Sequence, residues 1–598
     1  MPPEIRYTIV PHHPEAHLFR VSCRVGQPDP AGQVFRLPAW IPGSYMIREF
    51  ARNIVTLHAE ADGKPVRVTK LDKHTWRAAP VPAGRALTVT YDVYAWDLSV
   101  RAAHLDQTHG FFNGTSVFLS VLGQEDRPCL VDIRPPEGRA YAKWRVATAM
   151  RPARGEPGAA REFGFGLYRA EDYDELIDHP VEMGSFTHAR FEAGGVTHDF
   201  VLTGRHDCDL ARLTADLEKV CAWQIDLFGK PAPVDRYVFM AMIVGDGYGG
   251  LEHRASTALL ASRRDLPYPG MAGQTRDYRG FLGLCSHEYF HTWNVKRIKP
   301  AAFTPYDLTQ ENYTRLLWAF EGFTSYYDDL ALVRSGVITP ADYLDLLSTT
   351  ISRVLRGSGR LKQSVAESSF DAWTKFYRQD ENAPNAIVSY YAKGSLIALA
   401  LDLQLREASR GKTSLDDVMR LLWKNYGQRG IGVEEEGVFD AVTEVASAIS
   451  AEAAKRITDS LRRNVNGTAD LPLARLLKPF GVDYKASPAS NTPTLGVRMG
   501  KDTTIAAVYD DGPAQAAGLS AGDVLVALDG LKVTGSDLDA MLPRRKAGDR
   551  VRIHAFRRDE LMEFEVELAE APADAVKLTL WNKPPLPVGK LRKGWLGG

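Results

Sequence analysis

Residues 287–298, HEYFHTWNVKRI, give the clearest indication of the fold and chemistry of this chain. They overlap a segment, 281–295, whose apolar residues follow helical spacing. On a helix, residues four positions apart share one face, so the imidazoles of His287 and His291 can bind one zinc ion while Glu288 reaches water beside it. Two ordinary surface histidines on a helix are the alternative, because so short a pattern also arises by chance.

A second motif, WAFEGFT at 318–324, places one acidic residue among apolar ones. The apolar positions have helical spacing and imply burial, so the carboxylate of Glu321 needs a partner. Zinc would supply that partner. An ordinary ion pair on a helix is the alternative.

A third motif, GGLEH at 249–253, follows the strand-like run YVFMAMIV. Gly249 and Gly250 would let a substrate backbone approach closely along an exposed strand edge. Glu252 could then bind the positively charged amino terminus of a peptide. The alternative is a turn that carries a solvated glutamate.

Composition and charge limit the classes of partner. The 598 residues, 44% of them hydrophobic, exceed what one core usually supports. Because 73 Lys and Arg balance 74 Asp and Glu, we expect no nucleic-acid or membrane partner. The first residues lack the pattern of a signal peptide, and no later run is long enough to span a membrane, so we expect a cytoplasmic protein. Five scattered cysteines indicate reduced thiols.

Changes along the sequence predict a multidomain α+β fold. Residues 1–172 alternate polar and apolar positions between Pro/Gly turns, which is typical of a β-rich domain. Residues 173–410 mix a strand-like run with longer helical segments, which predicts an α+β catalytic domain. Residues 411–487 contain three segments of helical periodicity, which predict a small α-helical domain. A polar linker leads into a compact block at 488–575 and a C-terminal tail at 576–598.

With these three motifs, the chain resembles the glycyl aminopeptidase family, zinc peptidases of the gluzincin group that are distantly related to alanyl aminopeptidases. The resemblance implies a thermolysin-like catalytic domain with one Zn²⁺ per chain. It also implies that His287, His291 and Glu321 are the zinc ligands. By the same resemblance, Glu288 is the general base and the strand that carries Glu252 recognises the substrate amine.

Further matches to the family are LPAWIPGSYMIREFARNI at 37–54 and SYYAKGSLIALALDL at 389–403. Within the second, Tyr391 begins a segment similar to the Tyr-x-Lys-Gly element of alanyl aminopeptidases, whose tyrosine hydroxyl stabilises the oxyanion. Tyr391 is assigned that role by resemblance alone, and a core tyrosine is the alternative. Two departures from alanyl aminopeptidases, His253 in place of Asn and a longer gap before the third ligand, agree with the glycyl branch.

The block at 488–575 resembles a PDZ domain of the bacterial protease-associated kind. Its segment TLGV at 494–497 precedes a strand, and VYDDGPAQAAGLSAGDVLVALDG follows the course of that fold. Amides near Leu495, Gly496 and Val497 could hold a peptide carboxylate while an extended peptide adds to the sheet edge. The alternative is a module that only packs on the catalytic domain.

The sequence therefore predicts a zinc-dependent aminopeptidase that acts on peptides with a free N-terminus, and the resemblance implies a preference for Gly or Ala as the first residue. A possible second partner is a peptide C-terminus at the PDZ-like domain. The alternatives are an endopeptidase or another zinc hydrolase of the gluzincin group, and a catalytically silent PDZ protein that binds peptides.

Overall fold

A computed structural model describes residues 4–535 and 537–597. The chain forms two compact units, one of Met1–Asn312 with Trp423–Gly432 and one of Tyr313–Leu422 with Val433–Gly598. The division after Asn312 falls inside residues 173–410, the range predicted for the catalytic domain. The bounds of the five domains inferred from the sequence stay predictions, and the outermost ones, residues 1 and 598, lie outside the described residues.

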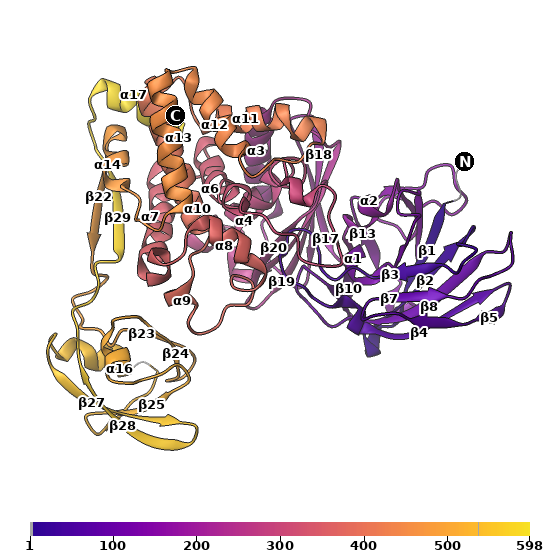
Figure 1. Cartoon of the computed structure of the whole chain (residues 1–598), viewed down its shortest axis with the longest axis horizontal. Coiled ribbons are helices and arrows are strands. Elements are labelled where there is room, and N and C mark those ends of the chain that lie inside the picture. The colour runs from indigo at the N-terminus through magenta and orange to yellow at the C-terminus, as the bar shows by residue number, and fades with distance from the viewer. Residues whose placement is uncertain (1–3, 536, 598) are drawn as a thin grey trace. The chain divides into compact units, whose positions relative to one another are not determined.

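An eight-stranded sheet begins the first unit, in the order β14-β15-β12-β1-β2-β8-β4-β5. Figure 1 labels β1, β2, β8, β4 and β5 of this sheet. In β2 (Leu18–Val25), the residues LFRVSCRV alternate between buried and more exposed positions, so one face of the sheet lies in the core. The other strands are β1 (Ile5–His13), β4 (Ile54–Ala61), β5 (Lys64–Val66), β8 (Leu87–Tyr94), β12 (Cys129–Ile133), β14 (Arg151–Pro152) and β15 (Gly166–Ala170).

Two four-stranded sheets complete the N-terminal β-rich domain, in the orders β13-β16-β10-β9 and β11-β3-β7-β6. Side chains from all three sheets share one core that includes Tyr7, Trp76 and Phe112. The predicted β-rich N-terminal region is thus confirmed. The elements are β3 (Val34–Arg36), β6 (Val68–Lys70), β7 (Thr75–Ala78), β9 (Ala103–Leu105), β10 (His109–Phe112), α1 (Gly114–Val117), β11 (Ser120–Val121), β13 (Arg145–Ala147), α2 (Tyr173–Ile177) and β16 (Val181–Gly184).

The first unit also contains a five-stranded sheet, in the order β17-β18-β19-β21-β20. Its edge strand, β20 (Tyr248–Glu252), pairs with β21 alone among the described strands. Helix α4 (Arg276–Phe290) packs on this sheet, where Tyr289 contacts Tyr237 of β19 and bonds to His198 of β18. The remaining elements are β17 (Thr187–Ala193), β18 (Val196–Thr203), α3 (Leu210–Phe228), β19 (Arg236–Val244) and β21 (Ser256–Ser262).

The second unit begins with helices, and the predicted helical region is confirmed. Helix α10 (Ala392–Ser409) is buried along most of its length, from Ala392 to Arg406, because other helices surround it. The other helices are α5 (Leu317–Phe320), α6 (Thr324–Arg334), α7 (Pro340–Arg356), α8 (Val365–Phe370), α9 (Ala383–Ala386), α12 (Gly437–Ser447), α13 (Ala451–Asn466) and α14 (Leu473–Leu477). Helix α11 (Leu415–Asn425) crosses the division between the units.

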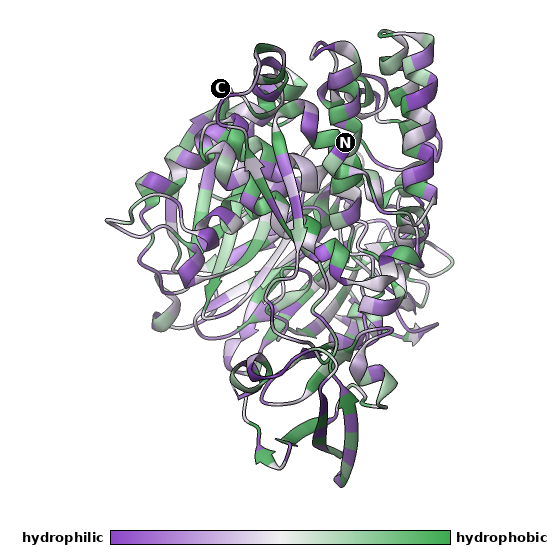
Figure 2. Ribbon diagram, turned by 90° about the vertical axis from the view of Figure 1, so that its left-hand side faces the viewer, coloured by the Kyte–Doolittle hydropathy of each residue, from purple (hydrophilic) through white to green (hydrophobic). Residues whose placement is uncertain are grey.

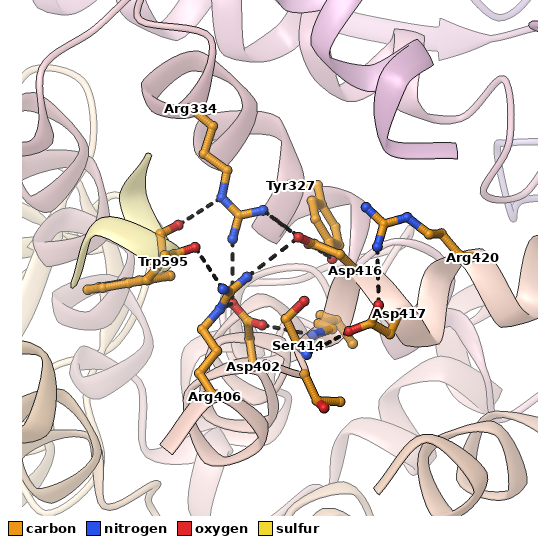
Figure 3. A network of polar contacts seen from close by, with 12 residues as sticks. Tyr327, Arg334, Asp402, Arg406, Ser414, Asp416, Asp417, Arg420 and Trp595 are labelled. Carbon is orange, nitrogen blue, oxygen red and sulfur yellow. Dashed lines mark hydrogen bonds and ion pairs between the residues drawn. The ribbon is translucent and has the colours of Figure 1, made fainter. Parts of the chain in front are cut away.

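A buried ionic network joins α6, α10 and the C-terminal helix α17 (Leu586–Leu596) (Figure 3). Arg334 donates to Asp416 at 3.0 Å and to the carbonyl of Trp595 at 2.7 Å. Arg406 donates to Asp402 at 2.9 Å and to the carbonyl of Gly594 at 2.7 Å. The C-terminal helix is therefore bonded into the helical bundle.

The PDZ domain closes the second unit, as predicted. Strand β22 (Val482–Ser487) precedes it and pairs with β29 (Ala575–Leu580), which follows it. Asn385 of α9 contacts this domain through hydrogen bonds with Val508 and Asp510, at 2.8 and 3.0 Å. Its elements are β23 (Val497–Met499), β24 (Ile505–Val508), α15 (Pro513–Ala516), β25 (Val524–Leu528), β26 (Leu531–Lys532), α16 (Asp537–Met541), β27 (Arg550–Arg557) and β28 (Glu560–Glu567).

Hydropathy along the ribbon alternates over short distances. Figure 2 shows hydrophilic and hydrophobic residues interspersed along the helices. Within residues 4–535 and 537–597, no helix has both the length and the apolar content that a membrane span requires.

Candidate active site

The two histidines of the first motif lie at the end of α4. The hydroxyl of Thr275 caps the start of this helix by accepting from the amide of Tyr278 at 3.1 Å. His287 is in the last turn, and His291, 1% exposed, is the C-terminal cap. Their Nε2 atoms are 3.1 Å apart. The predicted spacing thus brings both imidazoles together.

The orientation of His291 suits a metal ligand. Its Nδ1 lies 2.6 Å from the carbonyl oxygen of Asn294, and because a carbonyl only accepts, Nδ1 carries the proton. Nε2 then offers a lone pair towards His287, and a backbone carbonyl on the other nitrogen is the usual support of a metal-binding histidine. Two ligands of a tetrahedral zinc ion lie about 3.3 Å apart, so the Nε2 atoms fit such an ion closely.

Glu288 extends from α4 towards β20 and is 5% exposed. A Cβ atom on Gly250 would lie 1.9 Å from its Oε1, so any other residue there would have to displace this carboxylate. A Cβ on Gly249 would meet nothing closer than Arg101, at 3.5 Å. Gly250 therefore accommodates the carboxylate of Glu288, a reason for glycine that sequence reasoning did not supply.

Glu252 is the last residue of β20 and is 4% exposed, so it is a buried strand residue rather than a solvated residue of a turn. Gly43 lies against it, because a Cβ there would be 2.5 Å from its Oε2. Ligand-type atoms of Glu252, Glu288 and His291 all lie within 4.8 Å of one another. The first and third motifs thus meet at one place.

A buried ionic cluster lies next to Glu252, on the segments that follow β20 and α4. Asp178, after α2, accepts from Lys296 at 2.8 Å and lies 3.1 Å from Nδ1 of His253. It also accepts from the amide of Arg254 at 3.1 Å. Burial alone would raise the pKa of Asp178, but the charge of Lys296 and the contact with His253 outweigh it and hold that pKa well below its ordinary value. Asp178 therefore connects the segment after α4 to the segment after β20.

Arg101 is another contributor that sequence reasoning missed. Its guanidinium donates to the carbonyl of Gly250 at 3.1 Å. It comes from the N-terminal β-rich domain, far from the motifs in sequence, and a lone arginine in a loop offered no signal. This bond fixes β20 at the residue that faces Glu288.

Glu321 and Tyr391 belong to the second unit. Glu321, 1% exposed, ends α5, and Tyr391 precedes α10. The two segments touch backbone to backbone, because a Cβ on Gly322 would lie 2.7 Å from Cα of Gly394. The neighbouring Tyr390 is fully buried while Tyr391 is partly exposed, so the core position is that of Tyr390. The hydroxyls of Tyr391 and Tyr377 are 3.3 Å apart.

The predicted carboxylate loop begins the PDZ domain. Leu495 is 3% exposed and lies in its core. Gly496 has a φ of +72°, a conformation that favours glycine, and its amide donates to the Thr494 hydroxyl at 3.0 Å. Val497 begins β23, which pairs with β24.

Comparison with solved structures gives a match over nearly the whole chain. An aminopeptidase N family protein from Idiomarina loihiensis is 44% identical, with a TM-score of 0.93 over 99% of this chain and 100% of that one. An M1 zinc metallopeptidase from Deinococcus radiodurans is 14% identical over 79% of this chain and 94% of that one, with a TM-score of 0.47. The fold and the 44% match define a metallopeptidase of the aminopeptidase class.

Family comparison is more specific. Residues 6–185 match the Peptidase M61 N-terminal domain, 280–397 the M61 glycyl aminopeptidase domain, and 493–568 a PDZ domain. The chain belongs to the M61 glycyl aminopeptidase family. A curated relative, a probable periplasmic serine endoprotease DegP-like protein of Brucella suis, is 30% identical over 135 residues, 22% of this chain. The matched part spans 25% of that relative's length.

Proposed function

We propose that this chain is a zinc-dependent aminopeptidase that removes the first residue from peptides with a free N-terminus. The observation that carries the proposal is the convergence of Glu252, Glu288 and His291 within 4.8 Å. An exopeptidase must recognise the amine as well as the peptide bond, and a carboxylate fixed beside the reacting groups performs that recognition.

His287, His291 and Glu321 are the residues that would hold one catalytic zinc ion. Two imidazoles and a carboxylate are a donor set that zinc favours. When bound, zinc makes water a stronger nucleophile at neutral pH and polarises the scissile carbonyl. The distance between the two imidazoles and the orientation of His291 support this assignment.

Glu288 acts as general base and then as general acid. Its carboxylate takes a proton from the attacking water and later gives that proton to the nitrogen of the leaving peptide. The Tyr391 hydroxyl donates a hydrogen bond to the oxyanion that develops on the carbonyl. Glu252 holds the ammonium group of the first residue. The buried position of Glu288 against Gly250 supports its role, because that contact fixes the carboxylate.

Substrate preference and other partners follow from the family. We infer a preference for Gly or Ala as the first residue, and a peptide C-terminus as a ligand of the PDZ domain near Leu495, Gly496 and Val497. The cytoplasmic location stays a prediction from the sequence.

The test compares the wild type with Glu288→Gln and Glu252→Gln on glycyl, alanyl and leucyl amides and on an acetylated peptide. Glu60→Gln, an exposed change on β4, is the matched control. We expect Glu288→Gln to lower kcat by about 100- to 10,000-fold, and acetylated peptides to resist cleavage. Equal cleavage of acetylated and free peptides would favour an endopeptidase, and bound zinc without any cleavage would favour a silent peptide-binding protein.

A further inference from the structure

A second group of metal-binding side chains lies in the N-terminal β-rich domain. His104 of β9, Asp106 of the following turn and His109 of β10 each offer a ligand atom, and these atoms lie within 4.8 Å of one another. Both imidazoles are buried, with exposures of 4% and 2%. None of the three residues has a part in the proposed peptidase reaction.

Two ring nitrogens of this group have no hydrogen-bond partner among the described residues. They are Nδ1 of His104 and Nε2 of His109, and both are buried. A buried polar atom without a partner destabilises a fold, so native proteins usually satisfy it with protein, water or an ion. The partnerless Nε2 of His109 is the independent sign that something else binds here, and His104 offers its Nε2, beside Asp106, to the same place.

His109 is oriented as metal-binding histidines are. Its Nδ1 lies 3.2 Å from Oε1 of Glu182, which also accepts from the hydroxyl of Thr203 at 2.9 Å. The carboxylate keeps the proton on Nδ1, so Nε2 presents a lone pair. A carboxylate behind a histidine is the common outer support of a metal ligand, because it fixes the tautomer and raises the basicity of the ring.

Asp106 and His104 are also held in place. Oδ1 of Asp106 accepts from the amide and hydroxyl of Thr108, both at 2.6 Å. Oδ2 lies 3.3 Å from Nε2 of His104, and two ligands of a tetrahedral zinc ion have about the same separation. The His104 ring is stacked between Trp96 and His109, with centroid distances of 4.8 and 4.9 Å. The Asp106 side chain is 28% exposed, which gives an ion a path from solvent.

We propose that His104, Asp106 and His109 bind a second divalent metal ion, for which two imidazoles and a carboxylate favour Zn²⁺ over Mg²⁺ or Ca²⁺. Water completes the coordination, and Glu182 orients His109. The ion ties β9, the turn and the start of β10 together, and Glu182 of β16 supports it through His109. This site is additional to the one zinc ion that the sequence predicts per chain.

The test measures zinc bound to the full chain after equilibrium dialysis, in the wild type, His287→Ala, Asp106→Asn and the double variant. Asn keeps an oxygen that can accept from Thr108 but removes the charged ligand. We expect two zinc ions in the wild type, one in each single variant and none in the double variant. Asp132→Asn, a change on β12 of the same domain, should retain both ions.

Thermal melting supplies a readout independent of peptidase activity. Added Zn²⁺ should raise the melting temperature of His287→Ala, because an ion that binds only the folded state stabilises it, and should not raise that of the double variant. His109→Gln in the His287→Ala background repeats the test with a second ligand removed. No zinc bound to His287→Ala, or equal zinc in His287→Ala and the double variant, would overturn the proposal.

Discussion

At the residue scale, the space beside Gly250 is filled by the carboxylate of Glu288. We predict that Gly250→Ala lowers kcat by about 100-fold or more, because its Cβ would lie 1.9 Å from Oε1 and must displace Glu288, the proposed general base. Gly249→Ala is the matched control, since its Cβ would meet nothing closer than 3.5 Å. Steady-state kinetics on a glycyl amide checks both variants. Equal kcat values for the two variants would mean that turnover does not require the Glu288 carboxylate to lie beside Gly250.

Asp178 is the second residue whose contribution can be measured. We predict that Asp178→Asn lowers the free energy of unfolding at pH 7 by about 3–5 kcal/mol, because Lys296 stays buried without its counter-charge. Asp235→Asn breaks an ion pair whose partners are each 76% exposed, and should change little. Urea unfolding followed by circular dichroism measures both.

Asp178 should also make the stability of the fold depend on pH, and the direction of that dependence can be stated. The folded pKa of Asp178 lies well below its ordinary value, so its stabilisation is complete above the unfolded pKa of about 3.9 and is lost as pH falls through the folded pKa. The wild type should therefore lose stability on acidification below about pH 4 more steeply than Asp178→Asn. If the stability of the wild type and of Asp178→Asn fell equally with pH, the lowered pKa of Asp178 would be contradicted.

At the element scale, sequence periodicity predicted which helices exist better than where they end. The segment 318–324 reads as one helix, but α5 stops at Phe320 and α6 starts at Thr324. The break occurs where Gly322 contacts Gly394 of α10, a residue remote in sequence. The HEYFH motif lies within one helix and its cap, so its spacing was readable. Asp178 and Arg101 were not, because only the folded chain brings them to β20.

The contact between Gly322 and Gly394 yields the prediction at this scale. A Cβ on Gly394 would lie 2.8 Å from the carbonyl oxygen of Trp318, so Gly394→Ala must push α10 away from α5. We expect a loss of about 1–3 kcal/mol in stability together with lower kcat, because Glu321 and Tyr391 flank this contact. Gly280→Ala, on α4, meets no atom within 4 Å and should be neutral or stabilising. Thermal melts and kinetics of the two variants test this.

At the scale of the whole molecule, the segment interpreted as a C-terminal tail is folded. Residues 575–580 form β29, and residues 586–596 form α17. The Pro- and Lys-rich composition suggested a tail because most positions in α17 are polar or exposed. Its anchor, Trp595, is 0% exposed, and its indole donates to Tyr326 at 3.1 Å. Trp595 and Leu596 are the buried residues of α17, and two adjacent buried positions near a chain end give no periodicity, so the helix could not be recognised from sequence.

That anchor fixes the end of α17 in the core of the second unit. We predict that Trp595→Ala lowers stability by about 3–5 kcal/mol, the usual effect of removing a buried aromatic side chain. Deletion of residues 586–598 should cost more, because Arg334 and Arg406 then lose the carbonyls of Trp595 and Gly594 (Figure 3). Leu586→Ala, 74% exposed on the same helix, is the control. Hydrogen exchange should show faster exchange in α6 and α10 after deletion and no change in the control; unchanged exchange would mean that α17 only covers a bundle already stable without it.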